Sequence, residues 1–209
     1  MNEELARLQE LYSESSKHSN YQILPESVAN LLVNYSITVK SRFERERLSC
    51  ILSHIDPKGK CVLDIGGNTG FFSVEILDKG AKRVAYFEGN KSHADFVSLA
   101  TSILGYSKKI KIYNRYYSFT EDKFTYDIAL LLNVLHHVGD DYGNTDSSIE
   151  DAKRLILSQL NFMAYRAKVI VFQLGFCWKG NQDLLLFKNG TKSEMIDFIV
   201  EGSKDYWTV

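Results

Sequence analysis

A short glycine-rich segment at residues 64–70, with the sequence DIGGNTG, has the residue types best suited to binding a ligand against bare main chain. Glycine lets the backbone turn sharply and lets a ligand approach the peptide groups closely. The segment follows an apolar run and precedes the helix-like sequence FFSVEILDKG, so helix amides are expected nearby. Asn68 stands among the glycines, and asparagine tolerates a positive φ better than most residues. We expect a cofactor to contact Asp64, Gly66, Gly67, Asn68 and Gly70.

A carboxylate ends the next apolar run along the chain. Glu88 closes the sequence RVAYFE at 83–88, about 20 residues past the glycines, where ribose hydroxyls are usually accepted in α/β sheets. A dinucleotide site would instead need the spacing G-x-G-x-x-G, with a helix N-terminus holding a pyrophosphate. Because the segment reads GGNTG, the pattern favours a cofactor without phosphate. We predict that Glu88 accepts hydrogen bonds from the ribose of that cofactor.

Two adjacent histidines follow the fourth apolar run. His136 and His137 stand just beyond the run at 127–133, at the edge where ligands bind in open α/β sheets. An imidazole there can take a proton from a hydroxyl, although packing of one ring is the alternative. A metal site with Asp140 and Asp141 is less favoured, because consecutive positions do not converge easily on one ion. We therefore predict His136 or His137 as a general base, and no metal ligand.

Short apolar runs that alternate with helix-length segments must position these residues. The runs are almost continuously hydrophobic, which suits parallel strands buried on both faces. They lie at 61–66, 83–88, 109–114, 127–133 and 168–175. The segments between them predict helices at 70–79, 91–104 and 148–166, and Thr191 with Glu194 forms a capping-box pattern before a last helix.

Amphipathic stretches precede the first run and predict further helices. Leu5, Leu8, Leu11 and Tyr12 recur at helical spacing, and a second helical stretch runs from about Glu26 to Tyr35. In a third stretch, from Thr38 to His54, we expect one charged and one apolar face. The charged face would contain Arg42, Glu44, Arg45, Glu46 and Arg47, and the apolar face Phe43, Leu48, Ile51 and Leu52.

Residues 60–175, with the glycine segment, Glu88 and the fourth run, resemble class I S-adenosylmethionine-dependent methyltransferases. The resemblance implies a Rossmann-like, doubly wound, mostly parallel α/β sheet in the order 3-2-1-4-5. It implies S-adenosylmethionine (SAM) as the cofactor and S-adenosylhomocysteine as the product. Where the family often has an acidic residue beside adenine, this chain has Asn114 and Arg115, which we expect at the cofactor. Asn133 is expected to contact the methionine part.

The resemblance also divides the chain. Residues 1–55 are expected to form a helical cover on the substrate side, and residues 56–209 the SAM-binding domain. Class I methyltransferases usually end with two more strands, so strands 6 and 7 are expected to be missing or truncated here.

Substrate residues are expected in two flanking segments. His18 and Tyr21 lie in the expected cover, and Trp178 and Lys179 follow the fifth run, where a ring and polar groups suit a sugar. The paired histidines, the helix start GFFS and Arg115 are similar to methyltransferase domains that modify bacterial surface-polysaccharide sugars. We therefore expect O-methylation of a small molecule or a saccharide.

Composition limits the class of protein. The chain of 209 residues suits one α/β domain, and 25 Lys+Arg against 26 Asp+Glu give no sign of duplex nucleic acid as a partner. No apolar run approaches the length of a membrane span, and the N-terminus lacks the core of a signal peptide. The widely spaced Cys50, Cys61 and Cys177 fit reduced thiols. We expect a cytoplasmic protein.

Other functions stay open at this stage. N-methylation, or methylation of RNA or protein, is the first alternative, although the residues Asn133-Val134-Leu135-His136 differ from an NPPY-like tetrad. A methyltransferase-like binding module without catalysis is the second, and the presence of Gly66, Gly70 and Glu88 argues against it. The sequence does not specify an oligomeric state.

Overall fold

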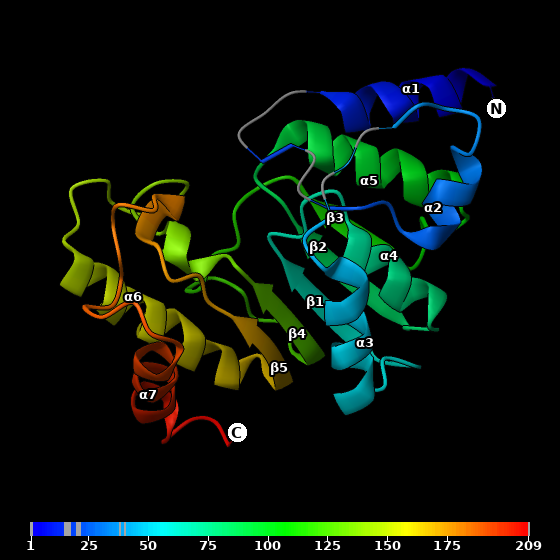
Figure 1. Ribbon diagram of the computed structural model, residues 1–209. Helices are drawn as coiled ribbons and strands as arrows, with labels where there is room; N and C mark the ends of the chain where they lie inside the picture. Colours follow the sequence, from blue (N-terminus) through cyan, green and yellow to red (C-terminus); the bar gives the residue numbers. More distant parts are fainter. Residues whose placement is uncertain (1, 15–17, 20–21, 38, 40, 209) are drawn as a thin grey trace. The chain divides into compact units, whose positions relative to one another are not determined.

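The computed structural model describes residues 2–14, 18–19, 22–37, 39 and 41–208 (Figure 1). Its contacts divide the chain into two compact units, unit 1 (Met1–Tyr117) and unit 2 (Ser118–Val209). The N-terminal helices therefore belong to the same unit as the first strands. We describe each unit by itself.

The strands form a five-stranded parallel sheet in the order β3-β2-β1-β4-β5, which confirms the predicted α/β topology. The parallel pairs β1–β2 and β2–β3 lie in unit 1, and the parallel pair β4–β5 lies in unit 2. Among the described residues, none after β5 forms a further strand. The bounds are β1 Cys61–Ile65, β2 Arg83–Phe87, β3 Ile110–Tyr113, β4 Tyr126–Leu132 and β5 Ala167–Gln173.

Two crossover helices and two outer helices pack in unit 1. Helix α4 (Phe71–Asp78) contacts β2 and helix α5 (Lys91–Ile103) contacts β3. Right-handed crossovers place both helices on one face of the sheet. Helix α1 (Asn2–Ser13) packs on α5, and helix α2 (Glu26–Leu31) packs on α4 (Figure 1). The N-terminal helices thus add an outer layer over the crossover helices.

The apolar spacing of α1 explains its position. Leu8, Leu11 and Tyr12 are buried, as their helical spacing predicts. The rings of Tyr12 and Phe96 lie 5.4 Å apart between centroids, which joins α1 to α5.

A buried glutamate joins α2 to α4. Glu75 is only 5% exposed, and its Oε1 accepts a hydrogen bond from the backbone amide of Glu26 at 2.8 Å. The first amides of a helix have no partner within the helix, so this carboxylate satisfies one of them from outside. The contact also explains how α4 tolerates a carboxylate on a buried face.

Helix α3 (Glu44–His54) corrects one sequence expectation. Glu44 was predicted on the charged face, yet it is fully buried, and Phe43 was predicted on the apolar face, yet it is 72% exposed. Both oxygens of Glu44 accept from the amide of Arg42, at 3.0 and 2.9 Å, and Oε2 also accepts from Ser41. The carboxylate therefore holds the turn that starts the helix, and Phe43 takes a left-handed conformation there.

Unit 2 has two long helices that contact each other, α6 (Ile149–Phe162) and α7 (Lys192–Ser203). Ser148 and Asp151 form a complete capping box at the start of α6. At α7 only half of the predicted box forms: Thr191 accepts from the amide of Glu194, whose carboxylate instead accepts from the amides at 188 and 189. The short helices are η1 Leu135–His137, η2 Met163–Tyr165 and η3 Trp178–Gly180.

Among the described residues, no helix has both the length and the apolar character that crossing a membrane requires.

Candidate functional site

The glycine segment forms a tight loop between β1 and α4 in unit 1. Gly66, Asn68 and Gly70 have φ values of 67°, 51° and 76°, in the region that favours glycine and asparagine. The amides of Gly66 and Gly67 donate to the carbonyl of Phe87, at 2.9 and 3.2 Å. The loop is thereby fixed to the end of β2, and the backbone of Gly66 is exposed to a ligand.

Two of the glycines are needed because side chains lie directly against them. A Cβ at Gly67 would lie 2.4 Å from the ring of Tyr86, and one at Gly70 would lie 2.7 Å from Val97. Both distances are shorter than a van der Waals contact. The close packing on these two residues gives the loop a defined shape before any ligand binds.

Asn68 takes part in a network that explains why it is not glycine. Its Oδ1 accepts from the amide of Thr69 at 2.8 Å, and its Nδ2 donates to the carbonyl of His18 at 3.0 Å. The hydroxyl of Tyr86 donates to its carbonyl. The side chain therefore joins the loop to the N-terminal segment, and the contact of Asn68 with a cofactor stays a prediction.

Glu88 is held in one orientation by two backbone amides. Its Oε2 accepts from the amide of Asn68 and its Oε1 from the amide of Asn90, both at 2.8 Å. A carboxylate offers roughly four acceptor positions, and these two amides occupy one on each oxygen. Glu88 is half-buried beside the glycine loop, as an acceptor for a pair of hydroxyls would need to be.

Asp64 lies behind the loop. It is 3% exposed, and its Oδ2 accepts from the hydroxyl of Ser73 at 2.6 Å. Burial raises the pKa of Asp64 to about 6, while the bond from Ser73 acts in the opposite direction and the charge of Glu88 adds to the increase. The structure thus gives Asp64 a contact with α4, and its role at the cofactor stays a prediction.

Asn114 and Arg115 lie at the exit of β3, in unit 1. The Nδ2 of Asn114 donates to the carbonyls of Glu88 and Gly89, at 3.0 and 3.3 Å, so the exits of β3 and β2 are joined. The guanidinium of Arg115 lies 5.3 Å from the ring centroid of Phe87 and 5.8 Å from that of Tyr113. These two rings are stacked 4.3 Å apart.

A residue that the sequence did not indicate supports the loop. The Oε1 of Gln22 accepts from the amide of Phe71 at 3.1 Å, at the first turn of α4, where Gly70 supplies no side-chain cap. The hydroxyl of Tyr12 in turn donates to the carbonyl of Gln22 at 2.7 Å. Because the contact spans the N-terminal segment and α4, no local pattern could predict it.

In unit 2, the two histidines differ in their surroundings. His136 is buried, and its Nδ1 accepts from the amide of Gly175 at 3.3 Å. A Cβ at Gly175 would lie 2.9 Å from this ring, so the imidazole packs directly on the backbone. In this tautomer Nε2 carries the proton, which makes His136 a poor acceptor for another one.

His137 has the opposite arrangement. Its Nδ1 lies 3.3 Å from the Oδ2 of Asp141 and 3.9 Å from that of Asp140. The contact with Asp141 is within ion-pair distance but is not a hydrogen bond, so it acts on the ring through the charge of the carboxylate. A negative charge beside Nδ1 favours a proton on that nitrogen and so leaves Nε2 able to accept another. The side chain of His137 is 18% exposed.

Asn133, at the exit of β4, has a positive φ of 59°, and its amide donates to the carbonyl of Gln173.

The predicted substrate residues have other contacts. Trp178 is 6% exposed and donates from Nε1 to the carbonyl of Val138 at 2.7 Å. The Nζ of Lys179 lies 4.4 Å from the ring centroid of Trp178 and donates to the carbonyl of Thr145. His18 is half-buried. Tyr21 lies outside the described residues.

No protein-family model matches the sequence, and no curated protein matches it. Solved structures do match. The bifunctional kinase-methyltransferase WbdD is 16% identical, with a TM-score of 0.59 over 87% of this chain and 40% of that chain. The complex of WbdD with the kinase inhibitor LY294002 is 19% identical, with a TM-score of 0.58 over 93% of this chain and 41% of that one.

The similarity and the strand order agree with the sequence prediction. The chain has the class I methyltransferase fold. It spans about 40% of the length of the WbdD chain. Within the class I methyltransferase fold, the glycine loop follows strand 1 and Glu88 follows strand 2, as the sequence predicted. The two histidines follow strand 4, in the short helix η1.

Proposed function

We propose that the chain is a SAM-dependent methyltransferase that transfers a methyl group to a hydroxyl of a small molecule or a saccharide. The observation that carries the proposal is Glu88, whose carboxylate is held by the amides of Asn68 and Asn90 beside an exposed glycine backbone. A carboxylate fixed in this way can accept from both hydroxyls of a ribose. The class I methyltransferase fold supports the same conclusion.

The residues of unit 1 fit the other parts of SAM. With the Nδ2 of Asn114 donating to two carbonyls, its Oδ1 is the atom that would accept from the adenine amino group. The backbone of Gly66 would contact the cofactor, because a bare α-carbon permits close approach. When bound, SAM supplies an electrophilic methyl group on a sulfonium.

His137 is the general base in this proposal. Transfer of a methyl group requires the acceptor oxygen to lie in line with the bond that breaks, and a sugar hydroxyl must also lose its proton. The Nε2 of His137 would take that proton, while Asp141 stabilises the imidazolium that forms. The role of Asp141 is therefore to position and stabilise the base.

A neutral acceptor fits the cations of the structure better than an anionic one. An acceptor that is already ionised needs no base but does need nearby cations. Arg115 lies over two aromatic rings, and Lys179 lies over Trp178 and donates to Thr145. Each cation has a ring contact, and Lys179 also donates to a carbonyl, which favours a hydroxyl acceptor although neither charge is neutralised among the described residues. The choice of a saccharide rests on the sequence resemblance.

Methyl transfer from labelled SAM to nucleotide sugars, glycans and small phenols tests the proposal. With the acceptor that is found, His137→Ala should lower turnover by the roughly 10²- to 10⁴-fold that loss of a general base causes, with unchanged SAM affinity. Asp141→Asn should lower kcat with little change in KM, and Asp140→Asn, the matched control, should have a smaller effect. Near-wild-type turnover of folded His137→Ala would refute the base. No transfer to any acceptor by a protein that binds SAM would favour a binding module.

A further inference from the structure

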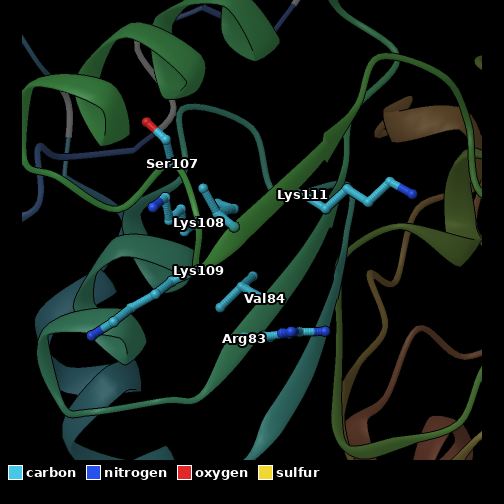
Figure 2. Close-up of a pocket in the computed structure, with 7 residues that line it drawn as sticks. Arg83, Val84, Ser107, Lys108, Lys109 and Lys111 are labelled. Atoms are coloured by element: carbon cyan, nitrogen blue, oxygen red, sulfur yellow. The ribbon is translucent and has the colours of Figure 1, made fainter.

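A pocket of about 310 Å³ lies at the start of β2 and β3 in unit 1, and it has no acidic residue in its lining. Cationic side chains dominate it. Figure 2 shows Arg83 and Lys111 extending to one side and Lys109 to the other, with Lys108 and Ser107 from the loop before β3. The residues that line it are Arg83, Val84, Ser107, Lys108, Lys109, Ile110 and Lys111.

The cations of the pocket are not neutralised within the described chain. None of them forms an ion pair with a carboxylate among the described residues, although Lys109 and Lys111 lie over tyrosine rings. An anion that bound among these four cations would meet no carboxylate of the pocket lining to compete with it. The adjoining segments carry further exposed charges of both signs, namely Lys58, Lys60, Lys79 and Lys82 together with Asp56 and Asp78.

The main chain around the pocket is fixed by backbone hydrogen bonds. The amide of Tyr106 donates to Thr101 at 2.7 Å, and the amide of Lys109 donates to Tyr106 at 2.7 Å. The hydroxyl of Tyr106 donates to the carboxylate of Asp78, the last residue of α4, at 2.6 Å. The start of β2 is also bonded to the residue that precedes β3, because the amide of Val84 donates to the carbonyl of Lys109 at 2.8 Å. The cations are thus presented from a fixed backbone.

The pocket is separate from the candidate cofactor site. Arg83 begins β2, whereas Glu88 follows its end, and the same relation holds for Lys109 and Asn114 on β3. Five residues of strand span about 17 Å, so the pocket and Glu88 lie at opposite edges of the same strands.

We propose that this pocket binds a ligand with two or more linked phosphate groups. The lining supplies four cations, which exceed the charge of a single phosphate but match that of a di- or triphosphate. Their spread over both sides of the pocket suits a chain of phosphates better than a compact ion. Lysine dominates the set, and an ammonium is a point charge that binds phosphate oxygens without the planar geometry that arginine imposes on carboxylates. The volume of about 310 Å³ lies at the lower end of the range of small-molecule sites, which suits a short chain of phosphates.

Titration calorimetry of the full chain with inorganic tripolyphosphate, at low and high salt, tests the proposal. We expect saturable binding that weakens with salt. The double variant Lys108→Glu, Lys111→Glu should lose at least about tenfold in affinity, since it reverses two of the lining charges. The control, Lys123→Glu with Lys188→Glu, changes the net charge equally at exposed lysines of unit 2 and should bind as the wild type does. Thermal unfolding of both double variants establishes that they fold.

Several results would overturn the proposal. These are the absence of tripolyphosphate binding to the wild type, and an equal loss of affinity in the two double variants, which would indicate unspecific attraction. Binding of single-stranded RNA or of anionic vesicles that depends on Lys108 and Lys111, without binding of tripolyphosphate, would assign the surface to a different partner. The titration with tripolyphosphate contains no SAM, so its outcome does not depend on whether the protein binds SAM.

Discussion

Asn68 illustrates how one residue can serve both the shape of a loop and its attachment. Its positive φ of 51° would suit glycine, but its side chain makes bonds to Thr69 and His18 that glycine would lose. We expect Asn68→Gly to lower the free energy of unfolding by about 1–2 kcal/mol, from the lost hydrogen bonds. Asn68→Ala should cost about 1 kcal/mol more, because alanine also resists the left-handed conformation. Urea unfolding measures both, and an alanine variant as stable as the glycine variant would contradict the account.

Asp64 gives the protein a predictable dependence on pH. Burial raises the pKa of Asp64 from 3.8 to about 6, so the ionised form is disfavoured in the folded state. Protonated Asp64 therefore makes its full contribution to the free energy of unfolding below the pKa that Asp64 has in the unfolded chain. This contribution is lost as the pH rises through about 6, the pKa of Asp64 in the folded protein. Asp64→Asn removes this dependence while keeping an acceptor for Ser73. Relative to the wild type, its free energy of unfolding should rise between pH 4 and pH 7, by up to about 3 kcal/mol. A constant difference over this range would refute the effect.

The sequence predicted candidate residues at this scale but not their contacts. Glu88 and the glycines follow from local spacing. The two amides that hold Glu88, and the bond from Asn68 to His18, depend on loops that meet only in the fold. The distinction between His136 and His137 has the same origin, because Gly175 lies far along the chain from the ring that packs on it.

At the scale of elements, the strands were predictable because parallel strands buried on both faces are almost continuously apolar. The predicted run at 83–88 and the strand Arg83–Phe87 differ at one end only. Helix α3 was predicted less well. A buried Glu44 contradicts a simple amphipathic pattern, and it is possible because the carboxylate accepts from the turn before its own helix.

The contact between α6 and α7 gives a prediction at the same scale. A Cβ at Gly202 would lie 2.4 Å from Leu157, so α7 packs on α6 through a bare backbone. Although alanine favours helix by about 1 kcal/mol over glycine, Gly202→Ala should destabilise the protein by about 1–3 kcal/mol through overpacking. In a Leu157→Ala background the same substitution should be neutral or stabilising. Denaturant unfolding of the four proteins measures the coupling, and additive effects would exclude it.

For the whole molecule, the sum of charges conceals their distribution. A formal net charge of −1 gave no sign of an anionic partner, yet four cations, Arg83, Lys108, Lys109 and Lys111, line one pocket of unit 1. The net charge sums residues that lie on different surfaces of the folded protein, so it cannot show where cations cluster. The predicted boundary between residues 55 and 56 stays a prediction. Helices α1 and α2 pack on α5 and α4, within the same unit as the first three strands.

The central claim is that unit 1 binds SAM through Glu88, and titration calorimetry of SAM into the wild type and into Glu88→Ala tests it most directly. The wild type should bind SAM, and Glu88→Ala should bind at least about tenfold more weakly, because a charge-assisted acceptor for two ribose hydroxyls is lost. Glu121→Ala, at an exposed glutamate, is the control and should bind as the wild type does. Circular dichroism establishes that each variant is folded. A wild type that does not bind SAM, or a folded Glu88→Ala with an unchanged dissociation constant, would contradict the account.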